Sequence, residues 1–139
     1  MDSRPAPVDT VGISVLIPVY NEAGSLAELY SRLTGVLEQT GRTFEMLFVD
    51  DGSSDGSAQE LDRLSQLDNR VRVLRFRRNF GKSAALDAGF SKVRGELVFT
   101  MDADLQDDPD EIPAFIARLE EGYDLVSGWK YKRHDPLSK

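Results

Sequence analysis

Two aspartates, Asp102 and Asp104, stand one residue apart where the apolar run 97–101 ends. In an extended chain, residues two apart point to the same side, so both carboxylates are expected to face one space. Close carboxylates repel each other unless a cation or a shared proton lies between them. Mg²⁺ and Mn²⁺ take oxygen ligands and are commonly held by one or two carboxylates together with substrate phosphates. The pair therefore suggests a metal-assisted nucleotide-phosphate site, although a solvated turn explains the same two residues.

The acids that follow have a structural explanation. Asp108, Pro109 and Glu111 match the start of a helix, with an aspartate N-cap, a proline in the first turn and a glutamate that closes a capping box. We therefore assign Asp108, Asp110 and Glu111 to the fold. Asp102 and Asp104 lie outside this pattern and need another reason.

Short β-branched and apolar runs alternate along the chain with amphipathic helical patterns. This alternation is typical of α/β folds, in which right-handed crossovers connect the strands of a parallel sheet. A short apolar run bounded by turn residues suits a strand that is covered on both faces. The predicted strands are 11–19, 44–49, 71–76, 97–101 and 125–129, and the predicted helices lie around 26–37, 61–67, 83–93 and 112–119.

Each of the first four predicted strands is followed directly by a polar loop. In a parallel sheet, ligands bind beyond the carboxyl ends of the strands, near the point where the strand order reverses. Four segments distant in sequence should therefore converge on one crevice, which strengthens the case for a site. The loops are Pro18–Glu22, Asp50–Asp55, Arg78–Lys82 and Asp102–Gln106.

Length and composition narrow the class of protein. The 139 residues suit one domain, and the net charge of −7 argues against nucleic acid as a partner. Because there is no cysteine and a single histidine, His134, thiolate metal sites and a multi-histidine zinc site are excluded within the chain. No apolar run approaches the roughly 20 residues of a membrane span. Local basic stretches near residues 70–82 and 130–139 suit an anionic ligand, a membrane surface or simply a solvated face.

Four motifs together resemble the inverting family 2 glycosyltransferases, in the branch that transfers sugar to a polyprenyl phosphate and includes dolichol-phosphate mannose synthases. The resemblance implies the GT-A fold, a Rossmann-like α/β three-layer sandwich with a mostly parallel central sheet. A dinucleotide oxidoreductase on a similar sheet is disfavoured, because the first strand lacks a Gly-x-Gly-x-x-Gly loop. A metal phosphatase with Asp102 as nucleophile is a further alternative. The motifs are Ile17–Glu22, Val49–Gly56, Arg78–Leu86 and Met101–Pro109.

The resemblance also implies roles for individual residues. Asp102 and Asp104 would be catalytic and would hold Mg²⁺ or Mn²⁺ against the diphosphate, with Asp51 on the base and Lys82 near the base or pyrophosphate. Simpler interpretations exist: Pro18 ends a strand, Tyr20 packs, Asp50 bonds its own turn, and Lys82 is an exposed helix-start lysine. The residues expected to bind the donor are Pro18, Tyr20, Asn21, Glu22, Asp50, Asp51, Lys82, Asp102, Ala103 and Gln106.

The reaction that the resemblance implies is transfer of a hexose, with inversion, from a nucleotide-diphosphate sugar to undecaprenyl or dolichyl phosphate. UDP-glucose is the favoured donor and GDP-mannose the alternative. An acceptor that is already an ionised phosphate needs no strong general base, in agreement with the lone histidine. The competing interpretation is a nucleotide-sugar-binding module without turnover of its own.

We expect three segments: a flexible tail at 1–10, the nucleotide-sugar-binding part of a GT-A catalytic domain at 11–130, and a basic tail at 131–139 where family members continue. The C-terminal part of a longer chain would bring the protein to the cytoplasmic face of a membrane. This chain itself has no transmembrane run, and homo-oligomerisation is left open.

Overall fold

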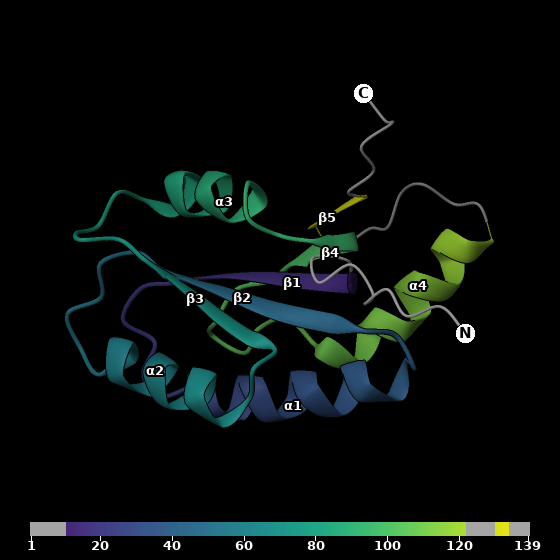
Figure 1. Ribbon diagram of the computed structural model, residues 1–139, viewed down its shortest axis with the longest axis horizontal. Coiled ribbons are helices and arrows are strands. Elements are labelled where there is room, and N and C mark those ends of the chain that lie inside the picture. The colour runs from purple at the N-terminus through teal and green to yellow at the C-terminus, as the bar shows by residue number, and fades with distance from the viewer. Residues whose placement is uncertain (1–10, 122–129, 134–139) are drawn as a thin grey trace, which may run out of the picture.

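A five-stranded sheet lies between two layers of helices in the computed structural model, which describes residues 11–121 and the backbone of 130–133 (Figure 1). Helix α3 covers one face of the sheet, and α1, α2 and α4 cover the other. This is the three-layer α/β sandwich that the sequence predicts. The elements are β1 Val11–Val19, α1 Leu26–Gln39, β2 Phe44–Asp50, α2 Ser57–Leu67, β3 Val71–Arg75, α3 Lys82–Phe90, β4 Gly95–Thr100, the 3₁₀ turn η1 Pro109–Glu111, α4 Ile112–Glu120 and β5 Lys130–Arg133.

The strand order is β3-β2-β1-β4-β5, with β1 to β4 parallel and β5 antiparallel to β4. The chain therefore builds outward from β1 to β3 and then returns to place β4 on the other side of β1. This reversal is the topological switch point, where ligands bind at the carboxyl ends of the strands. The loops after β1 and β4 lie at that point.

Both faces of the central strands are buried, so the strands read as continuous apolar runs. Alternate residues supply two separate cores. Ile13 and Phe48 pack toward α1, α2 and α4, whereas Leu16 and Leu47 pack toward α3. On the α3 side the helix comes close to β1, because a Cβ on Gly89 would lie 2.2 Å from Leu16 Cδ1. The absence of a side chain at Gly89 therefore permits this close approach.

Pro18 sits inside β1, one residue before its end, without breaking a strand-to-strand bond. The carbonyl oxygen of Leu16 accepts from Met101 N on the β4 side, and Asp51 N donates to Val19 O on the β2 side. Alternation directs the ring nitrogen of Pro18 toward the β4 side, beyond the last paired residues, Leu16 and Thr100. The missing N–H is thus tolerated because no partner strand continues there.

Most differences from the predicted elements are shifts of one to three residues at their ends. Strand β4 ends at Thr100 and leaves Met101 in the loop, and α3 starts at Lys82 and ends at Phe90. The predicted strand at 125–129 lies outside the described residues. Strand β5 overlaps the start of the segment at 131–139 that we expected to be a basic tail.

The turn that leads into α4 has the aspartate cap and the proline of the predicted pattern, while the closing bond from Glu111 stays a prediction. Asp108 precedes η1, and its side chain accepts a hydrogen bond from Asp110 N at 3.0 Å. Pro109 occupies the first position of η1, which leads directly into α4. The assignment of Asp108 to the fold is therefore confirmed, and its other contact, to Arg32 at 3.1 Å, is also structural.

Candidate functional site

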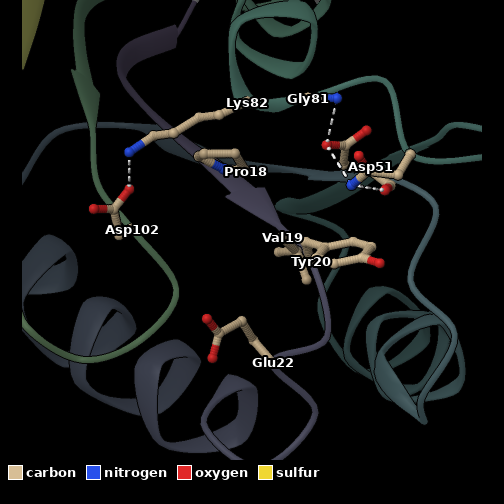
Figure 2. Close-up of a pocket in the computed structure, with 9 residues that line it drawn as sticks. Pro18, Val19, Tyr20, Glu22, Asp51, Gly81, Lys82 and Asp102 are labelled. Atoms are coloured by element: carbon tan, nitrogen blue, oxygen red, sulfur yellow. Dashed lines mark hydrogen bonds and ion pairs between the residues drawn. The ribbon is translucent and has the colours of Figure 1, made fainter.

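A cavity of about 420 Å³ opens at the carboxyl ends of the parallel strands (Figure 2). All four polar loops that were expected to converge contribute to it. Asp51 lies at one side of the cavity, and the side chains of Lys82 and Asp102 meet at the other. The lining residues are Pro18, Val19, Tyr20, Glu22, Asp51, Asn79, Gly81, Lys82 and Asp102.

Asp51 is nearly buried, at 3% exposure, and its carboxylate holds the loop that precedes α3. Oδ1 accepts from Phe80 N at 2.7 Å, and Oδ2 accepts from Gly81 N at 3.0 Å and from Asn79 Nδ2 at 3.1 Å. Buried carboxylates persist when N–H groups satisfy their oxygens. Asp51 therefore fixes the cavity wall that carries Asn79 and Gly81.

Gly52 allows this wall to approach the β2 loop. Its φ angle is +73°, a region that favours glycine, and a Cβ there would lie 2.2 Å from the carbonyl carbon of Arg78. Both the backbone conformation and the available space therefore require glycine at this position.

Lys82 and Asp102 form an ion pair at one end of the cavity, with 2.7 Å between Nζ and Oδ1 (Figure 2). The two side chains come from the first turn of α3 and from the loop after β4, and both are about half exposed. Gly81 precedes the lysine with φ +106°, so the backbone turns sharply into the helix. The pair places one positive and one negative group at the same end of the cavity.

Glu22 adds a third acidic group on the β1 side of the cavity. Partial burial raises the pKa of its carboxyl, and the negative charges of Asp104, Asp55 and Asp102 raise it further. These four carboxylates therefore create a negative potential that a bound cation would relieve.

The chain around Asp104 is a turn, whereas we expected it to be extended. Leu105 adopts φ +68° while its side chain packs against the core, and Asp104 Oδ1 accepts from Gln106 N at 3.1 Å. Ala103 is buried between the two aspartates. As a result Asp102 lines the cavity, whereas Asp104 is exposed beside it.

Some residues expected to bind the donor hold the loops together. The side-chain oxygen of Asn21 accepts from Ser54 N at 2.8 Å and from Asp55 N at 3.2 Å. Asp50 is buried and accepts from Ser53 N at 3.0 Å, as the simpler interpretation of that residue anticipates. The cavity lining includes Pro18, Tyr20, Glu22, Asp51, Lys82 and Asp102 but not Asn21, Asp50, Ala103, Asp104 or Gln106, whose ligand contacts stay predictions.

Sequence reasoning did not list Val19 or Gly81 among the donor-binding residues, and it placed Asn79 in the loop only. All three line the cavity. Gly81 carried a signal, since a glycine immediately before a predicted helix favours a special backbone angle and a close approach. Val19 carried none beyond its position next to Pro18.

Comparison with known proteins identifies the family. The sequence profile described as glycosyl transferase family 2 matches residues 14–138. The chain belongs to glycosyl transferase family 2. Among curated members, the undecaprenyl-phosphate 4-deoxy-4-formamido-L-arabinose transferases of Salmonella paratyphi A and Salmonella enteritidis are 47% identical over 133 residues, which is 95% of this chain. The chain spans 40% of the length of these relatives.

Solved structures similar to this family 2 chain agree on the fold. A mannosyltransferase from Pyrobaculum calidifontis, in complex with GDP-Man and Mn²⁺, aligns with a TM-score of 0.58 and 25% identity, over 74% of this chain and 30% of that one. S. aureus TarS 1–349 in complex with UDP-GlcNAc aligns with a TM-score of 0.62 and 25% identity, over 79% of this chain and 31% of that one. The expected GT-A-like architecture of the family 2 chain is confirmed.

The family implies a divalent metal. The carboxylates at the cavity of this family 2 chain are ligands that fit such a metal. The described residues hold no group of three or more histidine and acidic side chains that would bind a metal by themselves. Mg²⁺ and Mn²⁺ are commonly held by one or two carboxylates while substrate phosphates complete the shell. Asp102, with Asp104 beside the cavity, is a carboxylate set of this kind.

None of the helices between residues 11 and 121 of the family 2 chain has the length and apolar character needed to cross a bilayer.

Proposed function

We propose that this chain is the donor-binding part of a glycosyltransferase that moves a sugar from a uridine-diphosphate donor to a polyprenyl phosphate, with inversion. The observation that carries the proposal is the convergence of four strand-end loops on one cavity, with Asp51 at one side and the Lys82–Asp102 pair at the other. The uncharged base of the nucleotide would bind beside Asp51, and the metal-bound diphosphate would bind beside Lys82 and Asp102.

The hydrogen bonds of Asp51 favour uracil over guanine. A carboxylate has about four lone-pair positions, and the loop before α3 fills three of them, two on Oδ2 and one on Oδ1. The position left on Oδ1 suits the single N3–H of uracil. Guanine offers adjacent N1–H and N2–H donors, which need two free acceptor positions side by side.

The diphosphate end of the proposed site depends on charge. Asp102 and Asp104 would hold Mg²⁺ or Mn²⁺, which when bound neutralises the negative charge that develops on the leaving diphosphate. Lys82 supplies a second positive charge from the first turn of α3. Glu22 belongs to the same negative region: burial first, and then the charges of Asp104, Asp55 and Asp102, raise the pKa of its carboxyl.

The relatives bear on the sugar and the acceptor. Their names specify 4-deoxy-4-formamido-L-arabinose and undecaprenyl phosphate. UDP-linked 4-deoxy-4-formamido-L-arabinose therefore becomes the first donor to test, ahead of the UDP-glucose and GDP-mannose expected from sequence. A polyprenyl phosphate acceptor implies that the transfer takes place at a membrane surface. We propose that this surface is the cytoplasmic face of the membrane.

A second candidate function is donor binding without turnover. This function is favoured because the chain matches 40% of the length of its curated relatives. Turnover assays with UDP-sugar and undecaprenyl phosphate, on this chain and on a longer form, separate the two functions. Retention at the anomeric carbon of any product would contradict the inverting mechanism.

The direct test is isothermal titration of UDP and of GDP into the chain, with and without Mn²⁺. We expect UDP to bind in a Mn²⁺-dependent manner and GDP to bind at least about tenfold more weakly, the equivalent of one missing hydrogen bond. Asp104→Asn should abolish the Mn²⁺ dependence, whereas Asp110→Asn, an exposed acid outside the cavity, should leave it unchanged. Binding of neither nucleotide, or equal effects of the two substitutions, would contradict the proposal.

A further inference from the structure

The ion pair between Lys82 and Asp102 occupies a carboxylate that the proposed function assigns to a metal. Nζ lies 2.7 Å from Oδ1, which is a direct charge-assisted contact. A divalent cation that binds the same carboxylate is repelled by the ammonium group at this short range, so the two positive groups compete for Asp102. Lysine binding and metal binding at Asp102 therefore oppose each other.

The geometry gives Lys82 a second partner within reach. Its side chain starts at the first turn of α3, on the loop that Asp51 holds against the cavity. A lysine has a flexible four-carbon stem and three rotatable donors, so its ammonium can move while its backbone stays fixed. Because Lys82 lines the cavity, a diphosphate bound there is an alternative partner to Asp102.

Both side chains are about half exposed, at 49% for Lys82 and 44% for Asp102. Exposed ion pairs are weak, so the ammonium can be exchanged without a large barrier or a large loss of stability. A weak, solvent-accessible pair suits an exchangeable contact better than a structural one. The buried acid–arginine contacts elsewhere in the sheet, such as Arg72 with Glu45, have the opposite character.

We infer that Lys82 is the counter-ion of Asp102 in the nucleotide-free protein and transfers to the diphosphate when the nucleotide binds, freeing Asp102 for the metal. This inference rests on the proposed nucleotide-diphosphate function. It makes Lys82 a positioning residue that couples the two ligands, so that metal binds weakly alone and more tightly once nucleotide is present. Coupling of this kind is reciprocal, and nucleotide binding strengthens with metal by the same factor.

The test measures Mn²⁺ binding by electron paramagnetic resonance, which counts free Mn²⁺, and does not depend on turnover. Lys82→Gln removes the competing ammonium, so we expect Mn²⁺ alone to bind roughly two- to fivefold more tightly than to the unaltered chain. UDP without metal should bind more weakly to this variant. The ratio of the Mn²⁺ dissociation constants without and with UDP should shrink accordingly.

Lys92→Gln is the matched control, because it removes one positive charge from an exposed lysine that does not line the cavity. It should leave Mn²⁺ affinity unchanged, which separates the local exchange from the general effect of net charge. Lys82→Arg keeps the ion pair and should retain weak binding of Mn²⁺ alone. In an Asp102→Asn background, Lys82→Gln should give no gain, since the shared oxygen has lost its charge.

Equal Mn²⁺ affinities for the Lys82→Gln and Lys92→Gln variants, or no Mn²⁺ binding to any variant, would overturn the inference. The proposed function fails separately. If UDP binds with Mn²⁺ and Lys82→Gln changes nothing, the nucleotide site stands and the exchange is wrong. If Lys82→Gln tightens Mn²⁺ while UDP binds to no variant, the counter-ion role stands and the nucleotide proposal is wrong.

Discussion

The carboxylate of Asp51 accepts a hydrogen bond from the backbone N–H of Phe80 at 2.7 Å, joining the end of β2 to the loop before α3. Gly81 N and Asn79 Nδ2 add two more bonds to the same carboxylate. One buried side chain therefore sets the position of an entire cavity wall. The neighbouring Asp50, although equally buried, bonds within its own turn and toward Arg75.

Replacement of Asp51 by asparagine tests this role. The NH₂ of the new amide would point at an N–H group of the loop, so two donors would face each other and one hydrogen bond would be lost. We therefore expect UDP affinity to fall at least about tenfold and the free energy of unfolding to fall by about 1–2 kcal/mol. Titration calorimetry and urea unfolding measure the two effects. Asp62→Asn, on an exposed aspartate outside the cavity, is the control and should keep UDP affinity within about twofold of the original. Equal losses of UDP affinity in both variants would contradict a special role for Asp51.

Gly52 lies where the loop after β2 approaches the loop before α3, and Gly41 offers a comparison because it has a similar φ angle without a close neighbour. Their φ angles are +73° and +72°, but a Cβ on Gly52 would lie 2.2 Å from Arg78, while one on Gly41 would meet nothing within 4 Å. We expect Gly41→Ala to cost about 1 kcal/mol from backbone strain alone. Gly52→Ala should cost about 2–4 kcal/mol, since overpacking adds to the strain.

Urea unfolding of both alanine variants, followed by UDP titration, checks this difference. Only Gly52→Ala should weaken nucleotide binding, because only that substitution pushes the loop of Arg78 and Asn79 away from the cavity. Similar stabilities for the two variants would indicate that the loop shifts without cost.

The parallel sheet and the convergence of its loops could be predicted from sequence because both follow from local patterns. Apolar runs define the strands, and alternation with helices implies that their carboxyl ends share one edge. Pro18, Tyr20, Glu22, Asp51 and Lys82 were placed in these loops from the sequence and all line the cavity, while their contacts with the donor stay predictions. The hydrogen bond from Phe80 N to Asp51, which joins the end of β2 to the loop before α3, connects residues 29 apart in the sequence. No local sequence pattern indicates such a long-range bond.

Asp104 illustrates the opposite outcome. The alternation rule applies to extended backbone, but β4 ends at Thr100 and Leu105 takes a left-handed conformation. The same-side rule for extended backbone does not apply to this turn, and shared metal binding by Asp102 and Asp104 stays a prediction. The charge-rich residues 131–133 were predicted to belong to a basic tail, but in the structure they are part of β5, Lys130–Arg133. Charged residues are common in edge strands, so charge alone did not separate a tail from β5.

Asp68 gives a pH-dependent prediction away from the cavity. Hydrogen bonds from Arg70 lower its pKa to about 2, while Tyr30 donates to Oδ2 at 2.8 Å. Because the folded value lies below the model-compound value of 3.8, the stabilisation is complete above about pH 4 and is lost as pH falls toward 2. Asp68→Asn should therefore lower the free energy of unfolding by about 1–2 kcal/mol at pH 7, with allowance for the partly exposed Arg70.

Urea unfolding between pH 7 and 3 should show the Asp68→Asn difference narrowing below about pH 4. Ser65→Ala is the control, since it removes one exposed hydroxyl hydrogen bond to the backbone carbonyl of Asp62 and involves no titrating side chain, so its effect should not change over this range. A difference that grows as pH falls would reverse the sign and exclude the ion pair as its source.

Glu45 allows the fold to be perturbed without touching the proposed site. It is buried at the amino end of β2, where it accepts from Ser14 Oγ at 2.6 Å and from the arginines Arg72 and Arg94. Burial opposes ionisation, but the hydrogen bonds from Ser14, the Arg94 backbone and Arg72 outweigh it and lower the pKa of the carboxyl. The charged form is thus the one that joins the β1, β2 and β3 strands to the start of β4.

Glu45→Gln would leave the Arg72 and Arg94 guanidinium groups without their shared negative charge. Breaking a buried pair in this way costs about 3 kcal/mol, so we expect a loss of that size in urea unfolding at pH 7. Glu96→Gln, on an exposed glutamate of β4, should change stability by less than about 0.5 kcal/mol. Since the cavity lies at the opposite, carboxyl end of the strands, UDP affinity of the folded Glu45→Gln protein should stay within about twofold. A large loss of UDP affinity at a temperature where this variant is fully folded would show that the two ends of the sheet are coupled, contrary to the independence that their separation predicts.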